Sequence, residues 1–149
     1  HVLEPLAGYL SIGAAMLDGR GTEVAGAWNF GPDNDAAVPV GTLCAMLAEA
    51  WGEGGPRFRV EPPPNAPHEA GILRLDSTKA RQRLGWQPRL SLREALAMTA
   101  AWYRAQAAGA DMLRLSLTQI AEYAARLRPA VLPFSVSAPQ ASQFSVSRG

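Results

Sequence analysis

Helical periodicity is the feature that most constrains the fold of this chain. Apolar side chains recur at intervals of three and four over residues 91–108, and the same spacing returns over residues 112–127. Such spacing places the apolar residues on one face of an amphipathic helix. Residues 2–18 and 40–51 show the pattern as well. The sequence therefore predicts a largely helical chain.

Three short stretches between these helices predict strands. Residues 24–32 are apolar and end at Gly-Pro, which is typical of a buried strand. Residues 57–61 alternate between polar and apolar side chains, and residues 72–76 form another short extended stretch. Strands this short do not make a self-standing sheet. We expect an α/β lobe, mainly helical, that leans on a larger structure.

The stretch LDSTKARQRLGWQP predicts a short helix with marked ends. Asp76 and Ser77 are residue types that cap helix N-termini. Gly85 can adopt the left-handed conformation that ends a helix, and Pro88 cannot continue one. We expect Leu84, Trp86 and Pro88 to clamp the helix beneath the lobe and to direct the chain into the helix that follows.

Composition excludes several classes of function. The 149 residues carry a net charge of +1, so bulk electrostatics favour neither nucleic acid nor a membrane surface as a partner. No apolar run reaches the roughly 18 residues of a membrane-spanning helix. Cys44 is the single cysteine, which excludes a disulfide within the chain and makes a reducing cytoplasm the default location. One cysteine and two histidines cannot build a zinc-type cluster, so we expect no metal site.

The short helix also carries a resemblance to a known family. It is similar to the D-x-S/T-K-A-x-x-x-L-G-W-x-P stretch of the nucleotide-sugar branch of the extended short-chain dehydrogenase/reductase superfamily. The eight matching positions are Asp76, Thr78, Lys79, Ala80, Leu84, Gly85, Trp86 and Pro88. HVLEPLAGYL at residues 1–10, AWNFGP at 27–32 and PHEAGILRLD at 67–76 resemble the CDP-glucose 4,6-dehydratases in particular.

The resemblance implies a fold and a domain organisation. Residues 1–128 would form the helical C-terminal substrate-binding lobe of an NAD(P)-binding Rossmann-type enzyme. Such a protein carries about as many residues again before the position of His1, so we expect this chain to be a fragment. Residues 129–149 are rich in serine and repeat FSVS, which predicts a disordered tail. A strand-like peptide that docks on a partner is the alternative.

The resemblance also implies an activity, a lyase reaction that uses bound NAD. The C4 hydroxyl of CDP-glucose is oxidised, water is eliminated across C5 and C6, and the hydride returns to C6 to give CDP-4-keto-6-deoxyglucose. Family members commonly dimerise, so a homodimer is expected of the full-length protein.

This chain lacks the catalytic motifs of that reaction. GEGGPR follows a predicted helix and lacks the third glycine of a dinucleotide-binding turn, and no tyrosine is followed by lysine four positions later. We therefore expect neither catalytic nor cofactor-binding residues here, and an inactive chain on its own.

Four residues are candidates for substrate binding. His68 and Glu69 lie in the Pro-stiffened loop that closes over the diphosphate and sugar in relatives, or they form a solvated pair. Asn29 ends a predicted strand, where sites gather in α/β folds, or it caps a turn. His1 is placed near the nucleotide by the resemblance, although a terminal residue is expected to fray.

Other conspicuous side chains have structural interpretations. We expect the charges of residues 79–83 to form a solvated helix face and the Cys44 thiol to be buried and inert. We interpret the aromatic residues of the helices as core rather than as stacking platforms for a base. These aromatic residues are Trp51, Trp86, Trp102 and Tyr103.

Two rival functions remain. The first is the substrate lobe of another nucleotide-sugar epimerase or dehydratase, acting on UDP or dTDP sugars. The second is a non-catalytic helical interaction module that uses the FSVS tail as its contact.

Overall fold

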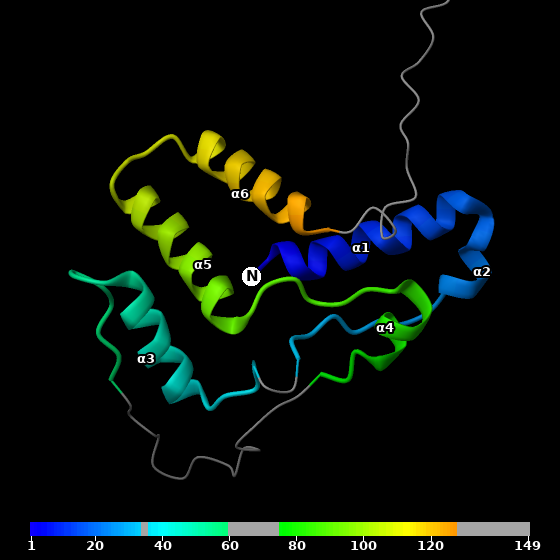
Figure 1. The fold of residues 1–149 in the computed structure, drawn as a ribbon, viewed down its shortest axis with the longest axis horizontal. Coiled ribbons are helices and arrows are strands. Elements are labelled where there is room, and N and C mark those ends of the chain that lie inside the picture. Colours follow the sequence, from blue (N-terminus) through cyan, green and yellow to red (C-terminus); the bar gives the residue numbers. More distant parts are fainter. Residues whose placement is uncertain (34–35, 60–74, 128–149) are drawn as a thin grey trace, which may run out of the picture.

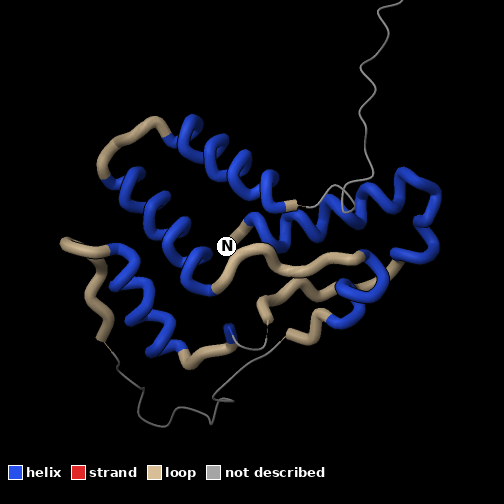
Figure 2. The backbone as a smooth tube through the Cα atoms, in the orientation of Figure 1, coloured by secondary structure: helices blue, strands red, loops and turns tan. Residues whose placement is uncertain are grey.

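The chain folds into helices joined by irregular segments (Figure 1). The computed structural model describes residues 1–33, 36–59 and 75–127, and no strand occurs among them (Figure 2). In chain order the elements are α1 Leu3–Ala15, the π-type turn η1 Met16–Arg20, α2 Gly21–Val24, α3 Val40–Trp51, α4 Thr78–Leu84, α5 Leu92–Ala107 and α6 Met112–Arg126. The mainly helical lobe predicted from the periodicity is therefore confirmed for this part of the chain.

Helices α5 and α6 form a hairpin with well-capped ends. Ser91 and Glu94 make a capping box at the start of α5, and the Asp111 side chain accepts a hydrogen bond from a backbone N–H at the start of α6. Gly109, with φ of 71°, reverses the chain between the helices. Because these signals are local, both helix boundaries lie within one residue of their predicted positions.

Helix α3 lies along α5 on the side opposite α6 (Figure 1). Its bounds, Val40–Trp51, are those predicted from the sequence. The guanidinium of Arg93 pairs with Glu49 at 3.1 Å, and the Arg104 side chain donates to the backbone oxygen of Trp51 at 3.0 Å. Both contacts are exposed, so they contribute little to stability.

The first helix is shorter than the predicted span of residues 2–18. Helix α1 ends at Ala15, and η1 follows with a backbone kink at Gly19, where φ is 78°. Glycine adopts this conformation without the steric cost that a side chain would bring. The kink sends the chain into the short helix α2 and then back along α4 (Figure 1).

The prediction of strands is wrong for the described residues. Residues 21–24 are helical and residues 25–32 make no strand ladder. Of the other two predicted strands only residues 57–59 and 75–76 are described, and neither stretch is a strand. The predicted burial holds only for Val24 and Gly31, since most of residues 24–32 are exposed. A strand also needs a neighbouring strand, and this segment lies against the start of a helix instead.

The short helix α4 ends as predicted. Gly85 has a φ of 63°, in the left-handed region, and its N–H donates to the backbone oxygen of Ala80. Trp86 is only 2% exposed, and its indole N–H donates to the backbone oxygen of Glu4 at 3.2 Å. The Phe30 ring packs edge-on against it at 5.0 Å between centroids. The predicted clamp is therefore confirmed for Trp86, which fastens α4 to α1.

The core is small and many large apolar side chains are exposed. Trp86 and Tyr123 are the large members of a buried set otherwise made of Val24 and alanines. Tyr103 is 52% exposed, so its interpretation as core is wrong: the α5 face that carries it is left open to solvent. Cys44 and the indoles of helices α3 and α5 are half-buried. Among the described residues, no helix is long and apolar enough to cross a membrane.

Candidate functional site

The segment of residues 27–33 meets the start of α4 at every second residue. Lys79 Nζ donates to the Ala27 oxygen at 2.9 Å, and the Asn29 amide donates to the Asp76 oxygen at 3.3 Å. The Gly31 N–H donates to the hydroxyl of Ser77 at 2.8 Å, and Arg81 pairs with Asp33. Alternate residues of an extended chain point the same way. The side chains of Ser77, Lys79 and Arg81 therefore take the place of a neighbouring strand as partners for this segment.

Residues between these alternate positions face the helices. The Phe30 ring lies over Gly8 of α1, where an added Cβ would come within 2.4 Å of the ring. Trp28 donates its indole N–H to the Val24 oxygen at 2.7 Å. Gly31 is also tightly packed, since a Cβ there would lie 2.9 Å from Leu75 Cβ. The two faces of this segment thus fix its position between α1 and α4.

A polar cavity of about 490 Å³ opens where this segment meets α4. It is lined by Pro32, Asp33, Leu75, Asp76, Ser77, Thr78 and Arg81. Two carboxylates, one guanidinium and two hydroxyl groups therefore face one space. Such a set can accept hydrogen bonds from the hydroxyl groups of a ligand and donate to its anionic oxygens. We call this cavity the polar pocket.

Asp76 is held in place as an acceptor at the rim of the polar pocket. Its Oδ1 accepts a 2.8 Å hydrogen bond from the Thr78 N–H. Hydrogen bonds from the side chain and backbone of Thr78 lower the pKa of Asp76 below its ordinary value. The carboxylate is therefore ionised at neutral pH. Ser77 occupies the N-cap position of α4, but its hydroxyl is used by Gly31, so Asp76 takes over part of the capping.

The charge run of α4 is only partly solvated, which corrects the expectation. Lys79 is half-buried and its ammonium lies 4.2 Å from the centroid of the Trp28 ring, a cation–π contact. Arg81 is half-buried and bound to Asp33. Arg83 is exposed, as expected. Lys79 and Arg81 are therefore bound by Trp28 and Asp33 from the segment of residues 27–33, and only Arg83 of these three cations faces solvent.

The structure does not gather the predicted site residues into one place. Asn29 is exposed and contacts the backbone of Asp76 beside the polar pocket. His1 lines a different cavity, between α1, α5 and α6. It is half-buried, and its Nδ1 accepts from the Leu3 N–H at 3.4 Å. His68 and Glu69 lie outside the described residues.

Sequence reasoning missed Asp33 and Arg81 as pocket residues. Asp33 stands in a polar loop, and Arg81 belongs to an apparently solvated run. They are 48 positions apart, so no local spacing could have paired them. Asp76 could be singled out from the sequence, but as a residue type that caps helix N-termini and not as a pocket residue.

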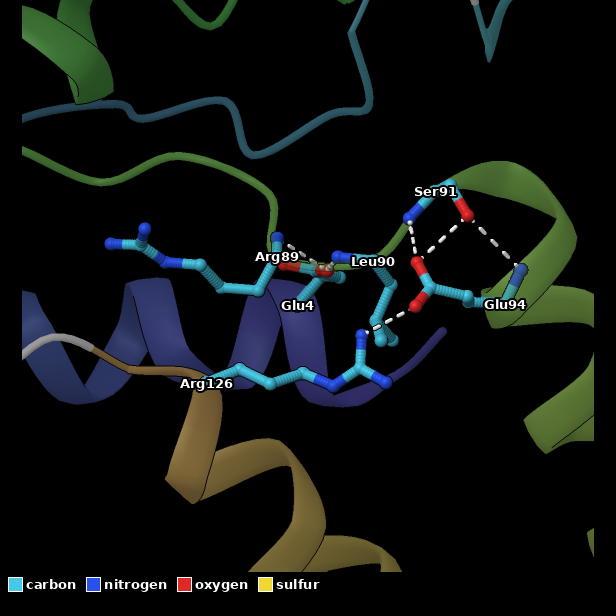
Figure 3. A network of polar contacts seen from close by, with 6 residues as sticks. All are labelled: Glu4, Arg89, Leu90, Ser91, Glu94 and Arg126. Atoms are coloured by element: carbon cyan, nitrogen blue, oxygen red, sulfur yellow. Dashed lines mark hydrogen bonds and ion pairs between the residues drawn. The ribbon is translucent and has the colours of Figure 1, made fainter.

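A polar network anchors the chain that leaves α4 (Figure 3). One Glu4 carboxylate oxygen accepts from the backbone N–H of Arg89 at 2.8 Å and of Leu90 at 2.7 Å. Nearby, Glu94 accepts from Ser91 and from the Arg126 guanidinium, which joins α5 to α6. These contacts set the direction in which residues 86–91 connect the pocket to the helical hairpin.

The described residues do not fit a dinucleotide or a metal ion. The glycines that follow α3 leave a helix rather than a strand, so no strand–turn–helix cradle for a pyrophosphate is present among these residues. No group of three His, Cys, Asp or Glu side chains in the described part of the chain is placed to hold a metal.

These features define a helical lobe whose polar pocket suits the hydroxyl groups and anionic oxygens of a ligand. No protein-family model matches the chain. It is 38% identical over 123 residues to the CDP-glucose 4,6-dehydratase of Salmonella typhimurium. The match covers 83% of this chain but 33% of the relative, so the chain spans about a third of that enzyme's length. The resemblance inferred from the sequence motifs is thereby confirmed.

Proposed function

We propose that this chain is the substrate-binding lobe of a nucleotide-sugar 4,6-dehydratase that converts CDP-glucose to CDP-4-keto-6-deoxyglucose. The observation that carries the proposal is the 38% identity to CDP-glucose 4,6-dehydratase over 83% of the chain. In this proposal residues 1–128 are the lobe and residues 129–149 a separate tail. The full-length protein is a cytoplasmic homodimeric lyase.

The polar pocket supplies chemistry that suits such a substrate. A nucleotide sugar presents many hydroxyl groups beside a diphosphate. Asp76, ionised and anchored by Thr78, can accept hydrogen bonds from sugar or ribose hydroxyls. Arg81 can share its guanidinium between Asp33 and a phosphate oxygen. The pocket holds two carboxylates, Asp33 and Asp76, and one cation, Arg81. Because the carboxylates repel a diphosphate, this pocket suits the hydroxyl-rich part of the ligand better.

The remaining candidates would complete the binding site. Asn29 lies beside the pocket and already contacts Asp76. His68 and Glu69 belong to the Pro-rich segment that precedes α4 in the chain, so we assign them to the diphosphate and sugar. His1 lines a separate cavity, and in this proposal it contributes through the nucleotide end of the site.

NAD would be bound by residues other than those described here. The cofactor supplies the oxidation and return of hydride in such a dehydratase. The described residues provide no cradle for it, and the Tyr-x-x-x-Lys pair does not occur in the sequence. We therefore assign to this chain the binding and orientation of the sugar, and we expect it to be inactive alone.

Calorimetric titration of the chain with CDP-glucose, UDP-glucose and dTDP-glucose tests the proposal. We expect heat of binding with CDP-glucose, weaker binding of the other two sugars, and a loss of about tenfold in affinity for Arg81→Gln, which removes a charge-assisted contact. Arg93→Gln is the matched control, because Arg93 pairs with Glu49 away from the polar pocket. Equal affinity for all three sugars contradicts the CDP assignment and favours an enzyme for another nucleotide sugar.

One observation favours the second candidate, a helical interaction module. Leu10, Leu17 and Leu113 are 69%, 83% and 73% exposed. A lobe with so much open apolar surface is built to be covered. The absence of binding to any nucleotide sugar, together with a defined polypeptide partner, would support the module over the dehydratase lobe.

A further inference from the structure

The charges that line the polar pocket do not balance. Asp33 and Asp76 contribute two carboxylates, and Arg81 contributes one guanidinium. Hydrogen bonds from Thr78 lower the pKa of Asp76, so its carboxylate is ionised at neutral pH. The described lining therefore carries one negative charge in excess. Its cavity of about 490 Å³ has a volume typical of a small-molecule site.

Asp33 reaches Arg81 from a segment that is fixed in place. Its Oδ1 accepts from Nη2 of Arg81 on α4, across 48 positions of sequence. Two residues before Asp33, the Gly31 N–H donates to the buried Ser77 hydroxyl at 2.8 Å. Because this contact holds the segment against the start of α4, the carboxylate of Asp33 is presented to Arg81 before a ligand arrives.

An arginine whose charge is already matched recognises neutral and anionic groups differently. A guanidinium has five N–H donors, and the contact with Asp33 uses Nη2, so Arg81 can still donate to a neutral hydroxyl or ring oxygen. A ligand carboxylate has to compete with Asp33 for the cation and is repelled by Asp76 as well. The side chains of Arg81 and Asp33 are 36% and 56% exposed, and a ligand that covers them excludes water and strengthens this repulsion.

We propose that Asp33 determines the sugar specificity of the polar pocket: by holding Arg81, it makes the pocket accept a neutral hexose and reject the corresponding hexuronic acid. The proposal rests on the function proposed above and adds to it the class of sugar. A hexose and its uronic acid differ only at C6, where a hydroxymethyl group is replaced by a carboxylate. They therefore form a matched pair of ligands that differ by one negative charge.

Calorimetric titration with a nucleotide-linked glucose and the corresponding glucuronate tests the proposal. The pair is CDP-glucose and CDP-glucuronate, or the equivalent UDP or dTDP pair if the chain binds that glucose form more tightly. We expect the unaltered chain to bind the glucose form about tenfold more tightly than the glucuronate form. Asp33→Asn releases Arg81 for the ligand carboxylate, so the affinity for the glucuronate form should rise about tenfold, with little change for the glucose form.

Further variants separate the release of Arg81 from a general effect of charge. The double variant Asp33→Asn, Arg81→Gln again leaves one negative charge in excess, so it should regain the preference of the unaltered chain. Arg81→Gln alone leaves both carboxylates without this cation and should sharpen the preference. Asp18→Asn is the matched control, because Asp18 is exposed and does not line the polar pocket. Circular dichroism establishes that each variant is folded, and Arg81→Gln decides the question if Asp33→Asn unfolds.

The outcomes distinguish this proposal from the proposed function. Equal binding of the glucose and glucuronate forms by the unaltered chain, or a preference that Asp33→Asn leaves unchanged, overturns the role of Asp33 and leaves the proposed function standing. A gain for the glucuronate form that is equally large in Asp18→Asn also overturns it, because the preference then follows the overall charge. If the chain binds no nucleotide sugar, both proposals fail together, since specificity for a sugar presupposes its binding.

Discussion

The hydroxyl of Tyr123 on α6 donates a 2.8 Å hydrogen bond to Glu4 on α1, across 119 positions of sequence. The other Glu4 oxygen accepts the backbone N–H groups of Arg89 and Leu90 (Figure 3). A single carboxylate therefore ties the first helix, the last helix and the chain between α4 and α5 to one another. Because only an acceptor with several lone pairs can do this, the position requires a carboxylate rather than an amide.

Replacing this carboxylate should destabilise the lobe. Glu4→Gln keeps the shape but offers one oxygen in place of two, which leaves at least one donor unpaired. We expect the free energy of unfolding to fall by about 1–3 kcal/mol, measured by urea denaturation followed by tryptophan fluorescence. Glu23→Gln is the control, since the pair that Glu23 makes with Arg20 is exposed. A change no larger than that of the control would contradict the role given to Glu4.

The same contact predicts a loss of stability in alkali. Burial and the hydrogen bond to Glu4 raise the pKa of Tyr123 above its ordinary value of 10.0. The folded state thus holds the phenol proton more tightly than the unfolded state does. The resulting stability is present below pH 10 and is lost as the pH rises above it. Urea denaturation from pH 8 to pH 11 should show this loss.

Tyr123→Phe should flatten that alkaline loss, because it removes the titrating group. Tyr103→Phe is the matched control, as Tyr103 is 52% exposed. A loss of stability that is equally steep in Tyr123→Phe and in the unaltered chain would assign it to other groups.

Glu94 predicts the opposite behaviour in acid. Hydrogen bonds from Arg126 and from Ser91 lower the pKa of Glu94 from 4.5 to about 2. The folded state therefore favours the ionised carboxylate, and this stability is present above pH 4.5 and lost as the pH falls toward 2. Urea midpoints of the unaltered chain should drop over this range, and those of Glu94→Gln should drop less.

Glu49→Gln provides the comparison for that experiment. Glu49 also pairs with an arginine, but its side chain is 66% exposed and it caps no helix. We expect its acid profile to match that of the unaltered chain. If Glu94→Gln loses as much stability in acid as Glu49→Gln, the lowered pKa of Glu94 does not contribute to the acid loss.

Two glycines of α1 should respond in opposite directions to alanine. A Cβ at Gly8 would lie 2.4 Å from the ring of Phe30, so Gly8→Ala forces the ring off Trp86. We expect a loss of about 1–3 kcal/mol, as for other overpacked sites. Gly13 has no atom within 4 Å of such a Cβ, so Gly13→Ala should stabilise the helix by about 0.5–1 kcal/mol. Thermal unfolding measures both; a stabilising Gly8→Ala would contradict the packing of Phe30 on α1.

Local signals predicted the helices well. Val40–Trp51 has its predicted bounds, and Gly85 ends α4 in the left-handed conformation. Helix periodicity and end signals act over a few residues, so they can be read without knowing the fold. The strand predicted at residues 24–32 is wrong because no second strand lies beside this segment, which pairs with side chains at the start of α4 and is mostly exposed.

The candidate site was less predictable. Asn29 was a candidate because it was expected to end a strand; that strand is absent, and the side chain contacts the backbone of Asp76 beside the polar pocket. The residues that give the pocket its charge, Asp33 and Arg81, have no common motif and meet only through the path of the chain. The resemblance placed His1 near the nucleotide, but His1 lines a cavity apart from the polar pocket beside which Asn29 lies.

The sequence by itself determined helices α3, α5 and α6, the end of α4 and the family resemblance, because each depends on residues close together in the chain. Tertiary structure alone decided that Glu4 serves both Tyr123 and the backbone of Arg89, and that Ser77 serves Gly31 instead of its own helix. A carboxylate or hydroxyl can accept from any donor brought within about 3 Å. Its partner is therefore set by the packing of distant segments, which no local pattern encodes.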